Sequence, residues 1–419
     1  MMTGYSRTLL ITLAALLAGF GGFNFLVDPY GLHGWAIPGI NEQRTRDFED
    51  GRRIQVGHQL GLTEERSVIL GSSRVVDGFP RTIPSWPGGL YNAGMRSTNA
   101  FELAHAAALA GADPDLRCLV IGLDMWEFAA GEKYKPAFPI SRLSDGSRVF
   151  SSLRATMAPN TFVRSVQTIA DNVTGAGTAD PFPDQYPAGR QRDWFTGTPR
   201  GHPGAASLRA DPARMDLLFG VLQRLADSGV QIVGFLHPVH AYNEEALFAV
   251  DRAGDYHAFR AEMAERFAAL SGDPVRACAP GGQGVLWDFA GFQAPAVSAL
   301  PEASATDPHP THHEPAHYRP RIGVTLIERI MAGDEDGEFG VRLTPASAAA
   351  TSAAIEQRRA AYLQTEDGEL LGSLTQQYAS GPTPAPSSWP LTPADLRGVE
   401  ALLEDVASRQ ARLSREEAS

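Results

Sequence analysis

Apolar residues occupy the start of the chain without interruption, from Thr8 to Val27 (TLLITLAALLAGFGGFNFLV). The stretch contains no charged residue, and Asn24 is its most polar side chain. A helix of this length, at about 1.5 Å per residue, matches a hydrocarbon core about 30 Å thick. Because Arg7 precedes the stretch, the positive-inside tendency places residues 1–7 in the cytoplasm. The pattern therefore predicts a transmembrane anchor, with the rest of the chain outside the cytoplasm.

The same stretch also has the position of a signal peptide, which is removed on export. It is longer than the usual apolar core of a signal peptide, and no clear A-x-A cleavage site ends it. These two features favour an uncleaved anchor. Either segment would place the chain that follows outside the cytoplasm.

Beyond the anchor, short apolar runs alternate with helical patterns, and this order is typical of an α/β protein. The clearest run is LRCLVIGL, and the clearest helix start is Asp211-Pro212, an N-cap followed by proline at the first helical position. The pattern predicts a three-layer α/β/α fold with a mostly parallel, five-stranded sheet in a flavodoxin-like order. The expected strands are 67–70, 90–92, 116–123, 230–236 and 285–289, and the expected helices are 99–112, 211–229, 256–270 and 322–331.

Composition divides the chain after the anchor into a main domain at 28–340 and an appendage at 341–419. The main domain carries an insertion over about 130–210, whose aperiodic part at 174–207 is typical of a long surface loop. The appendage combines an expected surface helix at 346–363, a proline-rich linker at 380–393 and a charged helix at 394–418.

The charge balance and the cysteine count limit the function classes. The net charge is −12, whereas nucleic-acid recognition requires a basic surface, so nucleic acid is excluded as a partner. Two cysteines are too few for a disulfide scaffold. Cys118 lies in an apolar run and is interpreted as a buried thiol, with a bond to Cys278 as the open alternative.

Candidate chemistry begins at Gly71-Ser72-Ser73-Arg74, where the first expected parallel strand ends. Sites in open α/β sheets assemble at the carboxyl ends of the strands. A serine on such a turn is exposed, and its own backbone N–H can help to stabilise an oxyanion. Strand-Gly-Ser-Ser is also a common turn, so this motif alone does not indicate an enzyme.

Three further short blocks follow in order, namely Asn92-Ala93-Gly94, Gly122-Leu123-Asp124 and Glu314-Pro315-Ala316-His317. With the serine turn they resemble the four sequence blocks of the SGNH (GDSL-type) superfamily of esterases and acyltransferases. The resemblance covers residues 67–331. The anchor and Asp28-Pro29-Tyr30-Gly31 are similar to membrane-tethered SGNH-like proteins that act on bacterial envelope glycans.

The resemblance implies that Ser73 is the nucleophile, with Ser72 in place of the usual aspartate. His317 aligns with the general base, and Glu314 aligns with the acidic residue that orients it. The spacing of these two residues suits the role, because Pro315 begins a turn across which a carboxylate can reach the imidazole Nδ1–H.

The resemblance also implies an oxyanion hole formed by the backbone N–H groups of Ser73 and Gly94. Asp124 stands where the family has an asparagine donor. An ionised carboxylate cannot donate a hydrogen bond, and it repels a developing oxyanion. Either Asp124 is protonated, or it has another role, or catalysis is weak or absent.

The segment from His313 to His317 also spells the zincin signature H-E-x-x-H, which requires both histidines on one helical face. Pro315 argues against this interpretation, because proline is tolerated only at a helix start and would leave His313 outside the helix. A looser zinc site at His309, His312 and His313 is an alternative to a solvated loop, and we favour the loop. Neither a metal nor a cofactor is therefore expected.

Four residues near expected strand ends are candidates for substrate binding: Arg74, Asn92, His237 and His240. Arg74 can orient an anionic or hydroxyl-rich substrate, or it can pair with a surface carboxylate. His237 and His240 follow the fourth expected strand, where a capping role in a turn is the alternative.

The residues and the resemblance together predict a serine esterase or O-acyltransferase that acts on an ester or glycan of the cell envelope through an acyl-enzyme at Ser73. The expected location is the bacterial cytoplasmic membrane, with the domain on the extracytoplasmic side. The family also implies a multi-span membrane acyl exporter as a partner. A catalytically inactive SGNH-like glycan-binding or scaffold protein is the alternative, and Ser72 and Asp124 favour it.

Overall fold

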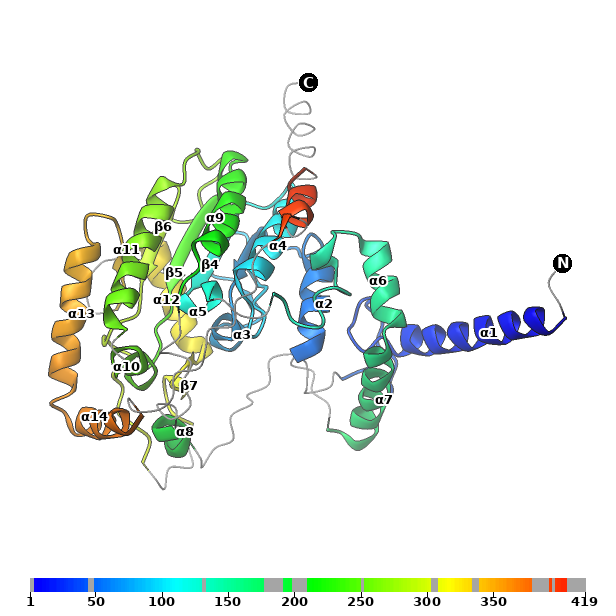
Figure 1. The fold of residues 1–419 in the computed structure, drawn as a ribbon, viewed down its shortest axis with the longest axis horizontal. Helices are drawn as coiled ribbons and strands as arrows, with labels where there is room; N and C mark the ends of the chain where they lie inside the picture. Colours follow the sequence, from blue (N-terminus) through cyan, green and yellow to red (C-terminus); the bar gives the residue numbers. More distant parts are fainter. Residues whose placement is uncertain are drawn as a thin grey trace. The chain divides into compact units, whose positions relative to one another are not determined.

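The chain divides into two compact units in the computed structural model (Figure 1). The first combines residues 1–62 with 136–183, and the second combines residues 63–135 with 184–419. All candidate catalytic residues belong to the second unit. The structure describes residues 4–43, 49–129, 133–176, 191–197, 209–249, 252–302, 308–333, 339–378, 392–393 and 396–404.

In the first unit, α1 (Gly4–Val27) is long and apolar enough to cross a membrane, as predicted for the anchor. Just after it, the Asp28 carboxylate accepts hydrogen bonds from the backbone N–H groups of Leu32 (2.8 Å) and His33 (3.0 Å). These bonds close a turn that leads the chain away from the helix. The other described helices of this unit are α2 (Glu49–Gln59), the short 3-10 helix η1 (Arg142–Ser144), α6 (Arg148–Met157) and α7 (Pro159–Thr174).

The second unit is built around a sheet that has seven strands within the described residues, in the order β2-β3-β1-β4-β5-β6-β9. The five inner strands are parallel, whereas β2 and β9 pair antiparallel at the two edges. The prediction of a mostly parallel sheet is confirmed, but the five-stranded, flavodoxin-like sheet is matched only in part because both edge strands were missed. The strands are β1 (Ser67–Leu70), β2 (Thr82–Ile83), β3 (Leu90–Asn92), β4 (Cys118–Leu123), β5 (Gln231–Leu236), β6 (Val285–Asp288) and β9 (Val341–Arg342).

Helices cover both faces of this sheet. Val233 and Phe235 of β5 point to one face and share a buried core cluster with Leu326 of α12 (Pro320–Ala332). Gly234, between them, points to the other face, where a Cβ atom would overlap the ring of Phe267 on α11 (Ala253–Ala269). The three-layer arrangement follows from this alternation. The remaining helices of the unit include α3 (Ser73–Gly78), α4 (Ala100–Gly111), α5 (Met125–Phe128), α8 (Gln191–Gly197), α9 (Pro212–Asp227) and α10 (Ala241–Ala249).

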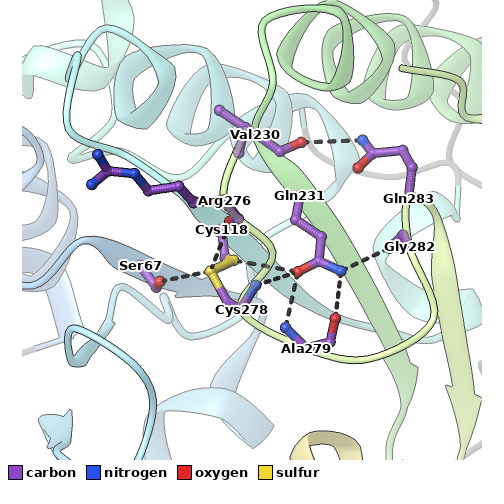
Figure 2. The surroundings of a disulfide bond; sticks show 9 residues. All are labelled: Ser67, Cys118, Val230, Gln231, Arg276, Cys278, Ala279, Gly282 and Gln283. Atoms are coloured by element: carbon purple, nitrogen blue, oxygen red, sulfur yellow. Dashed lines mark hydrogen bonds between the residues drawn. A yellow bond between two sulfur atoms is a disulfide. The ribbon is translucent and has the colours of Figure 1, made fainter. Parts of the chain in front are cut away.

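The two cysteines form a disulfide bond, and the interpretation of Cys118 as a free buried thiol is therefore wrong. Figure 2 shows the bond between the start of β4 and the loop that precedes β6. The Gln231 side chain anchors that loop: its oxygen accepts from the backbone N–H groups of Cys278 (2.7 Å) and Ala279 (3.0 Å), and its amide donates to the Ala279 carbonyl (2.8 Å). Apolar surroundings alone could not distinguish a thiol from half of a disulfide.

Part of the expected appendage packs on the α/β unit. The strand β9 extends the sheet, and the helices α13 (Ala348–Tyr362) and α14 (Glu366–Tyr378) contact α11 and α10. Arg359 forms a two-pronged ion pair with Glu245, at 2.6 Å for each hydrogen bond. Most of the expected loop at 174–207, most of the linker at 380–393 and the end of the tail helix lie outside the described residues.

Candidate functional site

The serine turn depends on a close approach of three chain segments. Gly71 follows β1 with φ of 156°, and a Cβ atom there would overlap Val75 and press on the carbonyl oxygen of Gly122. Only glycine therefore allows the chain to pass between β4 and the first turn of α3. Ser72 is the N-cap of α3, and Ser73 is its first helical residue. This geometry presents the Ser73 side chain at the carboxyl end of β1.

His317 and Glu314 are carried by a small antiparallel hairpin, in which β7 (His312–Glu314) pairs with β8 (His317–Tyr318). Its turn at Pro315 brings the Glu314 carboxylate against His317 Nδ1, while the second carboxylate oxygen accepts from the Ala316 backbone N–H at 2.9 Å. On the other side of the ring, His317 Nε2 lies 2.6 Å from Ser73 Oγ. The three residues thus form a continuous Ser-His-Glu chain, and the hairpin is incompatible with the helical H-E-x-x-H geometry.

The charge of Glu314 is supported by its partners. Burial raises the pKa of this carboxyl, but the hydrogen bond from His317 and the nearby charges outweigh that effect and leave the pKa below its usual value. Glu314 is therefore a carboxylate that can accept a hydrogen bond from Nδ1–H, which leaves Nε2 as the acceptor toward the serine hydroxyl.

A second carboxylate, Asp77, was not singled out from the sequence. Its Oδ2 atom lies 3.9 Å from His317 Nε2, and Arg96 holds it through two hydrogen bonds, one of 2.7 Å to the same oxygen. Asp77 stands one helical turn after Ser73 on α3, so the i, i+4 spacing is the sequence signal that could have found it.

The structure does not support Asn92 as a substrate-binding residue, and it changes the interpretation of Gly94. The Asn92 side chain is fully buried and donates to the carbonyls of Val75 (3.0 Å) and Phe79 (3.1 Å), which ties the end of β3 to α3. Its amide oxygen accepts from the Gly94 N–H at 2.9 Å. The backbone donor assigned to the oxyanion hole is therefore already used within the protein.

Asp124 has a structural role that its alignment with an oxyanion donor did not predict. As the N-cap of α5, it accepts from the Trp126 N–H at 2.6 Å, and its own N–H donates to Glu127 at 2.7 Å. Its other oxygen forms an ion pair with Arg74, whose Nε also donates to the Ala316 carbonyl at 3.1 Å. The Asp124 carboxylate accepts at both of its contacts, and its backbone N–H is bound by Glu127, so the structure gives no support to Asp124 as an oxyanion-hole donor.

The positive charge of Arg74 therefore neutralises the negative charge of Asp124. The guanidinium lies directly after Ser73 in the chain and compensates the carboxylate that would otherwise repel an oxyanion. Glu127 is a further buried carboxyl that the sequence did not mark. Burial raises the pKa of Glu127 to about 7, against the opposing influence of Arg74 and of a hydrogen bond from Ser72.

The two histidines after β5 are buried, and both are held by hydrogen bonds within the protein. His237 Nδ1 lies 3.1 Å from the Tyr318 hydroxyl, and His240 Nε2 donates to the Ser298 carbonyl at 2.9 Å. Burial lowers the pKa of His237 well below its usual value and that of His240 to about 3. The lowered pKa values favour the neutral form of both rings, and the His240 ring is bound to the Ser298 carbonyl.

The expected solvated loop at His309 and His312 is instead a buried cluster of hydrogen-bonded imidazoles. His309 Nε2 donates to the Ala299 carbonyl (2.8 Å) and His312 Nε2 donates to the Pro238 carbonyl (3.0 Å). Among the residues that the structure describes, no group of three or more His, Cys, Asp and Glu side chains could hold a metal ion. The rings instead support the base of the hairpin that carries Glu314 and His317.

A small pocket, partly open to solvent, lies beside the serine turn and includes Arg74 in its lining. Its polar lining comes from Arg74, Asp124, His237, Asn243 and Glu244. His237 thus borders a cavity although solvent does not reach it. The apolar wall consists of Met125, Trp126, Leu236, Val239, Leu247, Tyr256 and Phe259.

The spacing between the serine helix and the histidine strand is set by close packing. A Cβ atom on Gly78, the last residue of α3, would overlap the ring of Tyr318, which directly follows His317. A Cβ atom on Gly323 of α12 would overlap the carbonyl oxygen of Gly78. The helix, the strand and α12 therefore meet with no room for an intervening side chain.

Comparisons of the chain with protein-family models, with curated proteins and with solved structures each gave no match. The chemistry of the site is therefore taken from its geometry. The arrangement unites a hydroxyl, an imidazole in contact with it, and a carboxylate on the far ring nitrogen. Such a chain of groups is able to activate a serine as a nucleophile.

Proposed function

We propose that this chain is a membrane-anchored serine esterase or O-acyltransferase of the SGNH type, acting on an acyl ester or glycan of the cell envelope. The observation that carries the proposal is the 2.6 Å contact between Ser73 Oγ and His317 Nε2, with Glu314 on the opposite ring nitrogen. The same geometry serves hydrolysis and transfer, because the two reactions differ only in the group that accepts the acyl chain.

In the proposed mechanism, His317 Nε2 takes the hydroxyl proton as Ser73 Oγ bonds to the ester carbonyl carbon. Glu314 stabilises the imidazolium that results. The tetrahedral intermediate then expels the alcohol, which receives the proton from His317, and an acyl-enzyme remains on Ser73. Water or a sugar hydroxyl then gives its proton to His317 as its oxygen bonds to the acyl carbonyl carbon. The second tetrahedral intermediate breaks its bond to Ser73 Oγ, which takes the proton back from His317.

The intermediate's oxyanion requires donors that the structure leaves available. The backbone N–H of Ser73 lies in the first turn of α3, where helical N–H groups have no intrahelical acceptor. The Gly94 N–H would have to be shared with Asn92, or released by it, when substrate binds. The Arg74 guanidinium, directly after the nucleophile, offsets the negative charge of Asp124 at this edge.

Two features support an extracytoplasmic location at the bacterial cytoplasmic membrane. The helix α1 has the length and composition of a membrane span. The bond between Cys118 and Cys278 is of a kind that persists in oxidising compartments and is rare in the cytosol. A tethered domain would suit an envelope substrate, and an acyl donor supplied by a multi-span membrane exporter is part of the proposal.

A catalytically inactive glycan-binding or scaffold protein is the second candidate. The observation in its favour is that two of the three residues expected to form the oxyanion hole are already engaged. The Gly94 N–H donates to Asn92, and the Asp124 carboxylate is paired with Arg74. An enzyme of this type gains much of its rate from such donors. The two candidates differ in whether Ser73 forms a covalent bond.

Reaction with a fluorophosphonate probe tests the proposal without knowledge of the natural substrate. The full-length protein in detergent should form a phosphonylated adduct that peptide mass spectrometry assigns to Ser73. Ser73→Ala should remove the adduct, and His317→Gln should slow labelling by about 10²-fold or more, because the general base is lost. Ser271→Ala, at an exposed serine outside the site, is the matched control and should label at the wild-type rate.

Acetyl-ester hydrolysis by the same four proteins provides the second measurement. Hydrolysis that depends on Ser73 and His317 supports the enzyme. A folded wild-type protein that neither labels at Ser73 nor exceeds the rate of Ser73→Ala would overturn the enzyme in favour of the binding protein.

A further inference from the structure

The helices α6 and α7 of the first unit have an inverted distribution of side chains. Their buried positions include small hydroxyl residues, whereas most of their large apolar side chains are exposed. In a water-soluble surface helix the apolar stripe would face the core. The buried hydroxyl residues are Ser151, Thr161, Ser165 and Thr168, and the exposed apolar residues are Val149, Phe150, Leu153, Phe162, Val163, Val166 and Val173.

The exposed residues form a continuous stripe on each helix. On α7, Phe162, Val166 and Val173 recur at intervals of four and seven residues, which places them on one face. On α6, Val149 and Leu153 are one turn apart. Single apolar residues scattered over a surface are normal, but a group of them on two adjacent helices forms a patch that indicates a binding surface.

The same two helices are fastened to α1 by specific contacts. Asn24 is buried although it belongs to the apolar helix: its amide donates to the Thr156 carbonyl, and its oxygen accepts from the Ser165 hydroxyl, both at 2.9 Å. Phe162 stacks on Phe20 with ring centroids 5.5 Å apart. The polar side chain in α1 is therefore satisfied by α6 and α7, which fixes the pair against this helix.

These contacts set the depth of the pair along α1. Phe20 lies seven residues before the end of α1 at Val27, which corresponds to about 10 Å along a helix. Amphipathic helices that lie in a membrane interface bury their apolar face by about 5–10 Å. A span formed by α1 would consequently hold the junction of α6 and α7 at the depth of an interfacial helix.

The charges of the pair fit the same environment. Residues 148–174 contain three arginines and one aspartate, in a chain whose net charge is −12. Arginines beside an apolar stripe favour a surface of anionic lipid headgroups. The arginines are Arg148, Arg154 and Arg164, and the aspartate is Asp171.

We propose that α6 and α7 form an interfacial membrane-binding element, whose exposed apolar stripe inserts into the leaflet at the C-terminal end of α1. This inference rests on α1 spanning the membrane, and it is independent of any chemistry at Ser73. The occupant of the stripe is the acyl-chain and headgroup boundary of the same bilayer. The pair and α1 together then form one membrane-bound body.

Spin labels at single introduced cysteines test the proposal, because both native cysteines are held in the disulfide. Val149→Cys is compared with Val275→Cys, since both valines are 76% exposed and Val275 belongs to the second unit. The full-length proteins are reconstituted in vesicles of phosphatidylethanolamine and phosphatidylglycerol. The label at 149 should gain accessibility to oxygen and lose accessibility to a water-soluble nickel chelate, whereas the label at 275 should stay accessible to the chelate.

Val163→Cys, on the exposed face of α7, provides a second site should the first variant fail to fold. Equal nickel accessibility at 149, 163 and 275 in vesicles would overturn the proposal. A second outcome would overturn the proposal in favour of a protein partner. In that case the labels at 149 and 163 would be accessible to the nickel chelate in lipid vesicles, and they would become inaccessible to both oxygen and the chelate only after membrane extract is added. None of these outcomes depends on fluorophosphonate labelling, so this inference and the proposed enzyme can fail separately.

Discussion

The orientation of a single imidazole decides whether Ser73 can act as a nucleophile. Glu314 contacts Nδ1 of His317 and is itself fixed by the Ala316 N–H. The Nε2 lone pair is thereby directed at Ser73 Oγ. The carboxylate therefore has two effects, because it selects the tautomer and it stabilises the imidazolium.

Replacement of Glu314 by glutamine should show whether the carboxylate acts on the reaction rate rather than on substrate binding. Glu314→Gln keeps the shape of the side chain but removes its charge, so we expect kcat for ester hydrolysis to fall by roughly 10²–10⁴-fold with a small change in KM. Steady-state kinetics on an acetyl ester measure both constants. Glu328→Gln, on an exposed position of α12, is the control and should match the wild type. A kcat within a factor of about two of the wild type would contradict the role of Glu314.

Residue identity explains which parts of the site were predictable. Glu314 and His317 are three positions apart across a proline turn, so their contact follows from local geometry. The pairing of Arg74 with Asp124, by contrast, joins the ends of β1 and β4, which are about 50 residues apart in the sequence. Such contacts depend on how strand ends are brought together, and no local pattern specifies them.

Among the secondary-structure elements, the hairpin β7–β8 matters most because it carries both Glu314 and His317. Two donors hold the hairpin at its base: the His312 imidazole Nε2–H donates to the Pro238 carbonyl at 3.0 Å, and the His240 backbone N–H donates to the Pro315 carbonyl at 2.8 Å. Burial lowers the pKa of His312 well below 6.5 and that of His240 to about 3. Burial therefore favours the neutral form of both rings in the folded protein.

This arrangement predicts a loss of stability in mild acid. The folded state resists protonation of His240 and His312 while the unfolded state accepts protons near pH 6.5, so stability falls as pH decreases below about 6.5. Thermal unfolding followed by circular dichroism between pH 7.5 and pH 5 measures the effect. His312→Gln keeps an amide donor for the Pro238 carbonyl and should flatten this dependence. The same slope in the variant and the wild type would exclude His312 as a source.

The strength of each local pattern explains which elements were predictable. The runs that form β1, β4 and β5 are entirely buried, and their apolar residues marked them in the sequence. The edge strands β2 and β9 contain two residues each, too few to show a period. Their pairing is decided by neighbouring strands, which is tertiary information.

At the scale of the whole molecule, the disulfide is the strongest covalent constraint. Cys118 and Cys278 are separated by 160 positions in the sequence, with Cα atoms 6.4 Å apart. Such a bond lowers the entropy of the unfolded chain by closing a loop over these 160 positions. The sequence left the pairing open because only the fold brings these two positions together.

Removal of this bond should destabilise the protein without altering the reactive residues. The double variant Cys118→Ala, Cys278→Ala is expected to lose roughly 2–5 kcal/mol of unfolding free energy. Urea unfolding of the protein in detergent provides the measurement, and added reductant should lower the wild-type midpoint while leaving that of the double variant unchanged. Equal midpoints for the two proteins without reductant would show that the bond contributes no stability.

The contact at Gly78 has a consequence for how the rate of such a site can be adjusted. The ring of Tyr318 and the backbone of α12 meet this residue with no space for a methyl group. Tyr318 is covalently joined to His317, and Gly78 ends the helix that starts at Ser73. The absence of a side chain at this position thereby lets the helix of the nucleophile and the strand of the base approach closely. Selection or engineering could attenuate the reaction in graded steps at this position while all three reactive residues stay intact.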